Sequence, residues 1–298
     1  MIEWLPVILI TLLVLGLVLA LAYIYRAKKP KVASEGLFFE SHRGPIFYTI
    51  QGQGPSLLMV HGLGASSYCW RHNVENLQKD FRVITVDLWG FGRSSKKRTS
   101  EMGLDDHVKI LIDLMDDLKI QHFHLLGHSM GGHICLWLAR QYPGRVEKLV
   151  AVAPASHPKI APVGLRKLAW IAHWTPLIVN RRFIRTALQR EIKDPSLITD
   201  EVIDAYLSPY LDPDSHHSFA AAIAVLNDRR VYKQLEHIKC PVLLLLGKKD
   251  RVVKLKTIEQ IHKRLPNSQL HTHETCHHLP MEEDPSWIND EVRAYLKS

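Results

Sequence analysis

Short apolar runs alternate with longer segments of helical periodicity along most of this chain. Runs of four to eight residues rich in Val, Ile and Leu are typical of strands buried inside a sheet. Such runs lie at residues 82–87, 123–127, 147–153 and 241–247. Residues 46–50 and 56–62 are predicted to be early strands, and residues 268–273 to be the last strand. Helical patterns lie at residues 104–118, 130–142, 257–265 and 287–296. Strands alternating with helices predict an α/β fold, with a mostly parallel sheet covered by helices on both faces.

The alternation is interrupted between about residues 155 and 236. This segment contains several short helical pieces and several prolines, and it separates two predicted core strands. We interpret it as a helical cap insertion over the carboxyl edge of the sheet, where open α/β folds bind their ligands. The domain that carries this cap is expected to occupy residues 37–298.

A different pattern occupies the start of the chain. Residues 5–25 are almost entirely apolar and carry no charge, and Arg26 and three lysines follow at residues 26–31. About 20 apolar residues suffice to cross the hydrocarbon core of a bilayer. We therefore expect residues 1–30 to form a single-pass membrane anchor with a basic flank. The positive flank predicts that the N-terminus is outside and the remaining domain is in the cytoplasm.

A cleaved signal peptide is the alternative for this segment. Ala20 and Ala22 provide the small residues that a cleavage site needs. The residues before the apolar run carry no positive charge, however, and the run is long for a signal peptide. The anchor is therefore the favoured interpretation.

The chain of 298 residues has a formal net charge of +8, with part of the basic charge next to the apolar segment. No nucleic-acid-binding motif accompanies this charge, so a bilayer is a better expected partner than nucleic acid. The four cysteines form no CxxC pair, and the histidines near residue 275 do not complete an HExxH motif. We expect isolated thiols, no metal and no cofactor.

The most informative stretch is Gly127-His128-Ser129-Met130-Gly131, which matches G-x-S-x-G. A predicted strand enters it and a predicted helix leaves it, as a nucleophile elbow requires. Gly127 and Gly131 leave room for the tight turn that exposes the serine hydroxyl. The positive end of the following helix points toward a developing oxyanion. Ser129 is therefore predicted to be a nucleophile.

A serine needs a base, and the base needs a group that orients it. In this type of fold the acid follows the serine along the chain, and the histidine comes last. Asp250 follows the predicted strand 241–247, and the adjacent His277 and His278 follow the last predicted strand. Asp250 is the expected acid, and either histidine could be the base.

An oxyanion hole is also required. The predicted strand 56–62 ends in His61-Gly62-Leu63, which would form the supporting loop. The backbone N–H groups of Leu63 and Met130 are the expected donors.

Five motifs in this order resemble those of the α/β-hydrolase superfamily of serine hydrolases. They are HGLG at 61–64, DLWGFGRS at 87–94, GHSMGG at 127–132, GKKDRVV at 247–253 and HLPMEEDP at 278–285. The resemblance implies that His278 is the base, because His278, Glu283 and Pro285 match a motif of the form G-H-x-x-x-x-E-x-P. His277 stands where that motif usually has glycine and is the alternative base. Trp89 stands where proline is usual, and it either narrows the pocket or packs in the core.

One N-terminal span followed by such a domain is similar to membrane-anchored monoacylglycerol lipases. This similarity implies an amphiphilic small-molecule ester as substrate, cleaved through an acyl-enzyme on Ser129. Trp170 and Trp174 in the cap are consistent with a lipid-like substrate. A carbon–carbon bond hydrolase or a perhydrolase with the same three residues is the alternative. A non-catalytic binding protein on the same fold is a third, more remote possibility. The oligomeric state is left open.

Overall fold

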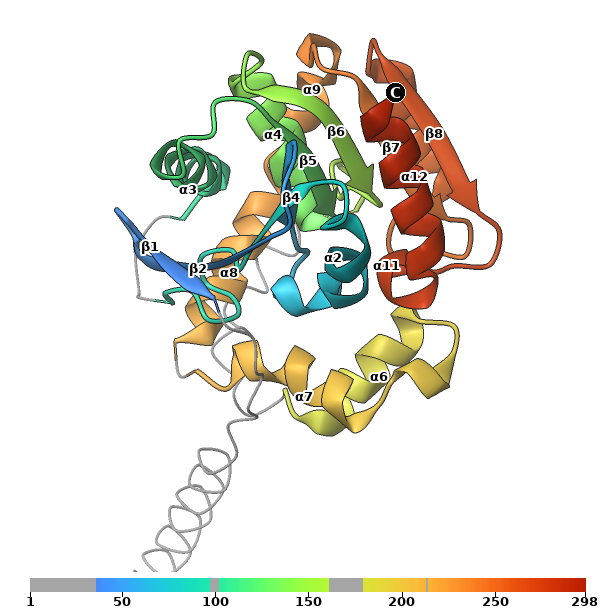
Figure 1. The fold of residues 1–298 in the computed structure, drawn as a ribbon. Helices are drawn as coiled ribbons and strands as arrows, with labels where there is room; N and C mark the ends of the chain where they lie inside the picture. Colours follow the sequence, from blue (N-terminus) through green and yellow to red (C-terminus); the bar gives the residue numbers. More distant parts are fainter. Residues whose placement is uncertain (1–35, 97–101, 161–178, 213) are drawn as a thin grey trace, which may run out of the picture. The chain divides into compact units, whose positions relative to one another are not determined.

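The computed structural model describes residues 36–96, 102–160, 179–212 and 214–298 (Figure 1). The predicted anchor at residues 1–30 lies outside these ranges, as do Trp170 and Trp174 of the cap. None of the helices within the described ranges is long and apolar enough to cross a membrane.

A single mixed sheet forms the centre of the described domain. Its strands are β1 (Leu37–Ser41), β2 (Gly44–Gln51), β3 (Ser56–Val60), β4 (Arg82–Val86), β5 (Phe123–His128), β6 (Val146–Val152), β7 (Val242–Gly247) and β8 (Ser268–His273). Their order across the sheet is β1-β2-β4-β3-β5-β6-β7-β8. The pairs β1–β2 and β2–β4 are antiparallel and all other neighbouring pairs are parallel. The predicted α/β fold with a mostly parallel sheet is confirmed.

Both faces of the central strands are buried, whereas the edge strands β1 and β8 are partly exposed. The helices are α2 (Arg71–Leu77), α3 (Leu104–Asp117), α4 (Met130–Gln141), α10 (Leu255–Arg264), α11 (Pro280–Glu283) and α12 (Pro285–Lys297), besides those of the insertion described below. Successive side chains of a strand point to opposite faces. In β3, Leu58 and Val60 join one apolar cluster with residues of α3, α4 and α10, whereas Leu57 and Met59 join another with residues of α2 and α12. This burial on both faces explains why the strands are continuous apolar runs rather than alternating ones.

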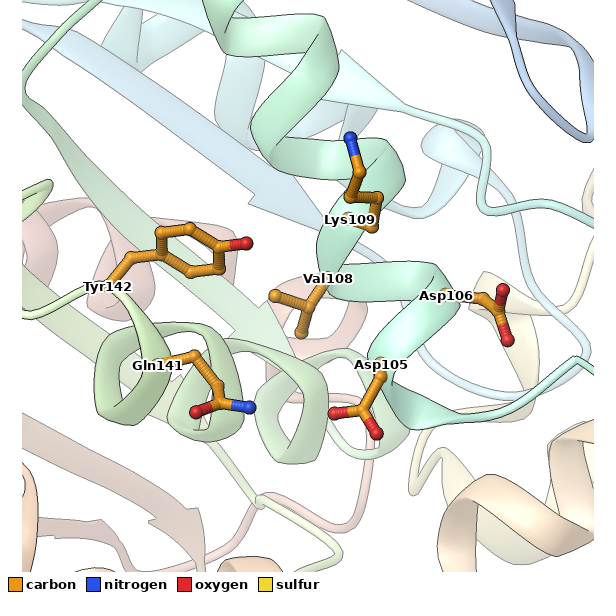
Figure 2. Close-up of a pocket in the computed structure, with 6 residues that line it drawn as sticks. All are labelled: Asp105, Asp106, Val108, Lys109, Gln141 and Tyr142. Carbon is orange, nitrogen blue, oxygen red and sulfur yellow. The ribbon is translucent and has the colours of Figure 1, made fainter.

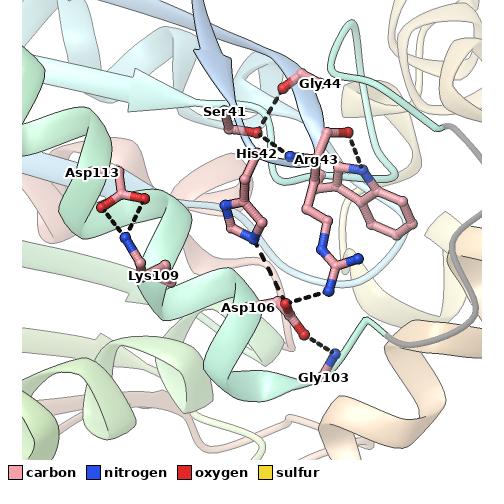
Figure 3. Close-up of polar contacts among 9 residues, drawn as sticks. Ser41, His42, Arg43, Gly44, Gly103, Asp106, Lys109 and Asp113 are labelled. Atoms are coloured by element: carbon pink, nitrogen blue, oxygen red, sulfur yellow. Dashed lines mark hydrogen bonds and ion pairs between the residues drawn. The ribbon is translucent and has the colours of Figure 1, made fainter.

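The strand β1 was not anticipated from the sequence. It pairs with β2 through a tight hairpin in which the Ser41 hydroxyl donates to the Gly44 carbonyl at 2.6 Å. The hairpin is fastened to the start of α3 by an ion pair of 2.8 Å between Arg43 and Asp106 (Figure 3). Asp106 also accepts a hydrogen bond from the Gly103 N–H, within the first turn of α3. This edge strand is short and largely exposed, so it lacks the long buried apolar run by which the central strands were recognised.

A helical insertion between β6 and β7 contains α6 (Arg181–Glu191), α7 (Asp200–Leu207), α8 (Ser215–Leu226) and α9 (Arg230–Lys233). In Figure 1, α6 and α7 lie next to each other below α2 and α11. Three side chains fasten the insertion to the core: Glu282 of α11 is paired with Arg71 at 2.6 Å and accepts a hydrogen bond from the Tyr206 hydroxyl at 2.9 Å. Glu282 is buried, so loss of either partner would leave a poorly compensated charge, which is costly.

Candidate active site

Ser129 occupies a strained turn between β5 and α4. Its φ of 51° and ψ of −113° lie in a region that side-chain-bearing residues rarely adopt. Surrounding hydrogen bonds hold this conformation: the Ser129 N–H donates to the Val152 carbonyl at 2.9 Å, and its own carbonyl accepts from His133 and Ala155 at 3.0 Å. Strain that is maintained by several contacts is typical of functional turns.

The two flanking glycines are required by close backbone packing. A Cβ atom on Gly131 would overlap the carbonyl oxygens of Val60 and His61, and one on Gly127 would lie 2.7 Å from the Gly131 carbonyl oxygen. The G-x-S-x-G pattern therefore reflects the space available around the turn. It places the serine at the carboxyl end of β5, next to the end of β3.

Asp250 lies in the turn after β7 and is buried. One carboxylate oxygen accepts hydrogen bonds from the N–H groups of Val252 and Val253, at 2.7 and 2.9 Å. The other oxygen lies 2.7 Å from Nδ1 of His278. The backbone donors fix the carboxylate so that it faces the imidazole.

His278 connects Asp250 to Ser129. Its Nε2 lies 3.1 Å from the Ser129 hydroxyl oxygen, and the residue is buried. A carboxylate can only accept, so Nδ1 carries the proton and Nε2 can accept the serine proton. Burial opposes the charged imidazolium, but the hydrogen bond to Asp250 and the charge of that carboxylate raise the pKa of His278 above its ordinary value. A serine, an imidazole and a carboxylate in this geometry can perform nucleophilic catalysis.

His277 has different surroundings, although it adjoins His278. Its backbone N–H donates to Glu283 at 2.6 Å and its Nδ1 lies 3.3 Å from the other oxygen of the same carboxylate. Glu283 also accepts a hydrogen bond from the N–H of Lys193 in the insertion. The structure thus brings His278, and not His277, to Ser129.

The HGLG loop lies against the serine, as the sequence suggested. A Cβ atom on Gly62 would lie 3.2 Å from the Ser129 Cβ. The buried His61 ring stabilises this loop: its Nδ1 donates to the Gly62 carbonyl at 2.7 Å and its Nε2 accepts from the Leu88 N–H at 2.9 Å. Burial lowers the pKa of His61, which favours the neutral ring that this pair of bonds requires.

The two predicted oxyanion donors come from the two segments that adjoin Ser129. Met130 is the first residue of α4, whose initial N–H groups have no partner within the helix. Leu63 directly follows Gly62 in the loop that lies against the serine. Both residues thus belong to elements that border the turn at Ser129.

Three further residues near Ser129 were not singled out by the sequence. The His128 ring donates a hydrogen bond to the backbone carbonyl of His278. The backbone carbonyl of Glu191 accepts a hydrogen bond from the His278 N–H. The Tyr210 hydroxyl lies against Gly64. In the sequence, His128 occupies only the first variable position of the G-x-S-x-G motif, so nothing marks it as important. Glu191 and Tyr210 come from the insertion, where no motif marks them.

Trp89 is buried in the core, and its indole N–H donates to the Arg43 carbonyl at 3.2 Å. The structure therefore favours packing over narrowing of the pocket.

All four cysteines, at 69, 135, 240 and 276, are buried and unpaired. Over the described parts of the chain, no three His, Cys, Asp or Glu side chains gather in a way that could hold a metal ion.

A surface cavity of about 520 Å³ lies between the start of α3 and the end of α4 (Figure 2). Its lining residues are Asp105, Asp106, Val108, Lys109, Gln141 and Tyr142. Ser129, Asp250 and His278 are absent from this lining. Asp105 and Asp106 are engaged by Arg230 and Arg43. This cavity is therefore separate from the candidate active site.

Comparison with known proteins agrees with this architecture. Residues 55–188 match the family model of the alpha/beta hydrolase fold, and residues 208–286 match that of serine hydrolase (FSH1). A pimeloyl-[acyl-carrier protein] methyl ester esterase of Vibrio atlanticus is 30% identical over 250 residues, covering 79% of this chain and 92% of that protein.

Two further relatives are named for a different activity. A 2-hydroxy-6-oxononadienedioate/2-hydroxy-6-oxononatrienedioate hydrolase of Burkholderia vietnamiensis is 27% identical to this chain. The alignment covers 85% of this chain and 91% of that protein. The solved structure of a meta-cleavage product hydrolase from Pseudomonas fluorescens has a TM-score of 0.76 and 25% identity, covering 88% of this chain and 97% of that one. The chain belongs to the alpha/beta hydrolase fold family. Within that family it is a serine hydrolase.

Proposed function

We propose that the protein hydrolyses carboxylic esters through an acyl-enzyme on Ser129, with His278 as the general base and Asp250 as its orienting acid. The observation that carries this proposal is the hydrogen-bonded chain from the Ser129 hydroxyl through both nitrogens of His278 to Asp250, at 3.1 and 2.7 Å. The esterase relative, which by its name acts on a methyl ester, supports the same reaction class.

The first half of the reaction forms the acyl-enzyme. His278 Nε2 takes the proton of Ser129 while the serine oxygen attacks the ester carbonyl carbon. The N–H groups of Leu63 and Met130 stabilise the resulting oxyanion, and loss of one such donor typically costs about 3 kcal/mol of transition-state stabilisation. The tetrahedral intermediate then collapses as the imidazolium gives its proton to the departing alkoxide.

The second half releases the acid. His278 takes a proton from water, the resulting hydroxide attacks the acyl carbonyl, and the second tetrahedral intermediate expels Ser129. The serine oxygen recovers a proton from the imidazolium. Asp250 keeps the imidazole in the required tautomer throughout and stabilises its charged form. No metal or cofactor takes part in this scheme.

We further propose a lipid-like acyl ester such as a monoacylglycerol as substrate. Residues 1–30 would hold the enzyme in a membrane with the catalytic domain on the cytoplasmic side. Support for this location comes from the uncharged apolar run at residues 5–25 and the basic residues that follow it. An enzyme held at a bilayer would meet amphiphilic esters at high local concentration.

A second candidate function is hydrolysis of carbon–carbon bonds in small oxo-acids. Two relatives support it. The Burkholderia protein, by its name, hydrolyses dienedioates, and the Pseudomonas structure is of a meta-cleavage product hydrolase. The same three residues serve both reactions, so Ser129, His278 and Asp250 do not discriminate between them.

A substrate panel separates the two candidates. Purified full-length protein in detergent would be assayed with short-chain aryl esters, monoacylglycerols, lysophospholipids and a 2-hydroxy-6-oxo-dienoate, with Ser129→Ala as the control. The proposal predicts turnover of long-chain esters that the variant loses. Turnover of the dienoate alone would establish the second candidate instead, and ester turnover that persists in the variant would exclude Ser129 as the nucleophile.

A further inference from the structure

The segment that carries His278 contacts the helical insertion at several points. The His278 N–H donates to the backbone carbonyl of Glu191, at the end of α6, at 3.2 Å. Further along the same segment, the Glu283 carboxylate accepts a hydrogen bond from the Lys193 N–H at 2.9 Å. A third contact comes from α7 and ends on the side chain of Glu282. The base of the proposed reaction therefore lies on a segment that is held both from the end of α6 and from α7.

Glu282 is bound from two sides. One carboxylate oxygen accepts hydrogen bonds from the Tyr206 hydroxyl of α7 at 2.9 Å and from Arg71 at 2.8 Å, and the other oxygen lies 2.6 Å from the second guanidinium nitrogen. Arg71 begins α2, which follows the HGLG loop and the short helical turn Ser67–Trp70. Its guanidinium also lies over the Tyr68 ring, 4.2 Å from the ring centroid. Glu282 thus links α11 to the helix after the oxyanion loop and to the insertion.

Burial makes these contacts strong. Glu282 and Tyr206 are both buried. Hydrogen bonds to ionised groups are shorter and stronger than those between neutral groups, and an electrostatic contact is strengthened further in the low dielectric of the interior. The two-bond pairing with Arg71 fixes the orientation of the carboxylate that the Tyr206 hydroxyl binds. A shift of α7 would therefore shift α11 as well.

The position of α11 matters because His278 lies only four residues before Glu282. The intervening residues enter α11 through Pro280, whose ring restricts the backbone. Nε2 of His278 lies 3.1 Å from the Ser129 hydroxyl oxygen, within the range that proton transfer requires. A displacement of about 1 Å in such a contact can lower a rate by on the order of 100-fold.

We propose that Tyr206 is a positioning residue for the general base. Its hydroxyl, acting through Glu282, holds the segment that carries His278 at the distance from Ser129 that proton transfer requires. The insertion then supports the base directly. This inference rests on the proposed ester hydrolysis and adds to it a residue that no motif in the sequence marks.

A substrate-binding role for Tyr206 makes a different prediction. A residue that lines the acyl site affects esters according to the length of their acyl chain. A residue that positions His278 affects every ester by the same factor, because all of them need the same proton transfers. Acylation and deacylation both use His278, so both steps slow together and KM changes little.

The test compares Tyr206→Phe with Tyr68→Phe in the full-length protein in detergent. Each variant loses one hydroxyl and keeps its ring. Tyr68 is a matched control because its ring packs edge-on against that of Tyr206, with 6.5 Å between the centroids, whereas its hydroxyl donates to Glu201 in an exposed contact. The measured quantities are kcat and KM for the 4-nitrophenyl esters of acetate, butyrate and octanoate, and the rate at which a small fluorophosphonate labels Ser129.

The proposal predicts that Tyr206→Phe lowers kcat by roughly tenfold for all three esters, slows labelling by a similar factor and leaves KM within about twofold of wild type. Tyr68→Phe should retain the wild-type values. Circular dichroism and thermal unfolding would show that each variant is folded. If Tyr206→Phe is not folded, Arg71→Lys provides a second test. It keeps the charge beside Glu282 but not the two-bond pairing, and the same uniform loss is expected.

A loss that depends on acyl length, with unchanged labelling of Ser129, would make Tyr206 a substrate contact and overturn its positioning role. Unchanged kcat in folded Tyr206→Phe, or an equal loss in Tyr68→Phe, would overturn it as well. Each of these results leaves ester hydrolysis intact. Absence of Ser129-dependent turnover by wild type would instead overturn the proposed function itself.

Discussion

His128 Nε2 lies 2.8 Å from the backbone carbonyl oxygen of His278, a residue 150 positions away in the chain. A carbonyl only accepts, so Nε2 of His128 carries the proton and donates it. Burial lowers the pKa of His128 well below its ordinary value, and the neighbouring His278 lowers it further. His128 therefore stays neutral beside an imidazole that becomes charged during the proposed reaction, and it fastens the histidine loop to the turn that carries Ser129.

The first prediction concerns this bond. His128→Leu should lower kcat/KM for a neutral ester by roughly tenfold or more, because a carbonyl of the histidine loop loses its buried donor. His128→Gln should retain most of the activity, because its amide supplies an N–H in a similar position. Steady-state kinetics on both variants would check this. Equal activity of the Leu variant and wild type would show that the bond does not position His278.

The second prediction separates the two adjacent histidines. His278→Ala should reduce kcat by at least about 1,000-fold, because Ser129 loses its base. His277→Ala should have a much smaller effect, since its ring pairs with Glu283 rather than with the serine. The two variants should be compared at equal concentrations of folded protein. The reverse ranking would assign the base to His277.

The third prediction is the pH dependence of the proposed base. His278 must be neutral to accept the serine proton, and its pKa is raised above 6.5 by Asp250 despite the opposing effect of burial. The acidic limb of kcat/KM should therefore have its midpoint above pH 6.5, with activity lost as the pH falls through that raised pKa. In Asp250→Asn the midpoint should move to lower pH, along with a large loss of rate. A midpoint that does not move would argue against the pairing of Asp250 with His278.

The fourth prediction concerns the stability cost of Glu191. The pKa of Glu191 is raised in the folded protein, so ionisation of its carboxyl group lowers the free energy of unfolding. This loss of stability begins as the pH rises above the ordinary glutamate pKa of 4.5 and is complete above the folded-state pKa. Glu191→Gln should therefore raise the midpoint of thermal unfolding at pH 8, and raise it less at pH 5. Differential scanning calorimetry would measure both shifts. A lower midpoint at pH 8 would indicate that the carboxylate stabilises the fold.

The fifth prediction tests the proposed anchor. Deletion of residues 1–30 should move the protein from the membrane fraction to the soluble fraction, because the apolar run is then absent. Ultracentrifugation of cell extracts, with the intact chain as the control, would measure this. Retention of the shortened chain on membranes would place a binding surface within residues 31–298.

Local pattern was sufficient for much of the fold. The apolar runs of β3 to β7 are buried on both faces, so they stand out as continuous Val, Ile and Leu segments. The helix at 104–118 was expected one residue longer than α3, and the short α2 at Arg71–Leu77 was not expected. A seven-residue helix is stabilised by its packing against the core, which local periodicity does not reveal.

The sequence by itself determined the order of the elements and the turn at Ser129, because both depend on neighbouring residues: apolar periodicity for the elements, and small glycines around a strained serine for the turn. Only the tertiary structure decided which distant groups meet there. It brought His278 Nε2 to Ser129 across 149 positions. It also placed the His128 ring on the His278 carbonyl and the Glu191 carbonyl on the His278 N–H. Such contacts arise where the parallel strands end at one edge and the insertion folds back over it, and no local pattern encodes the meeting of those chain segments.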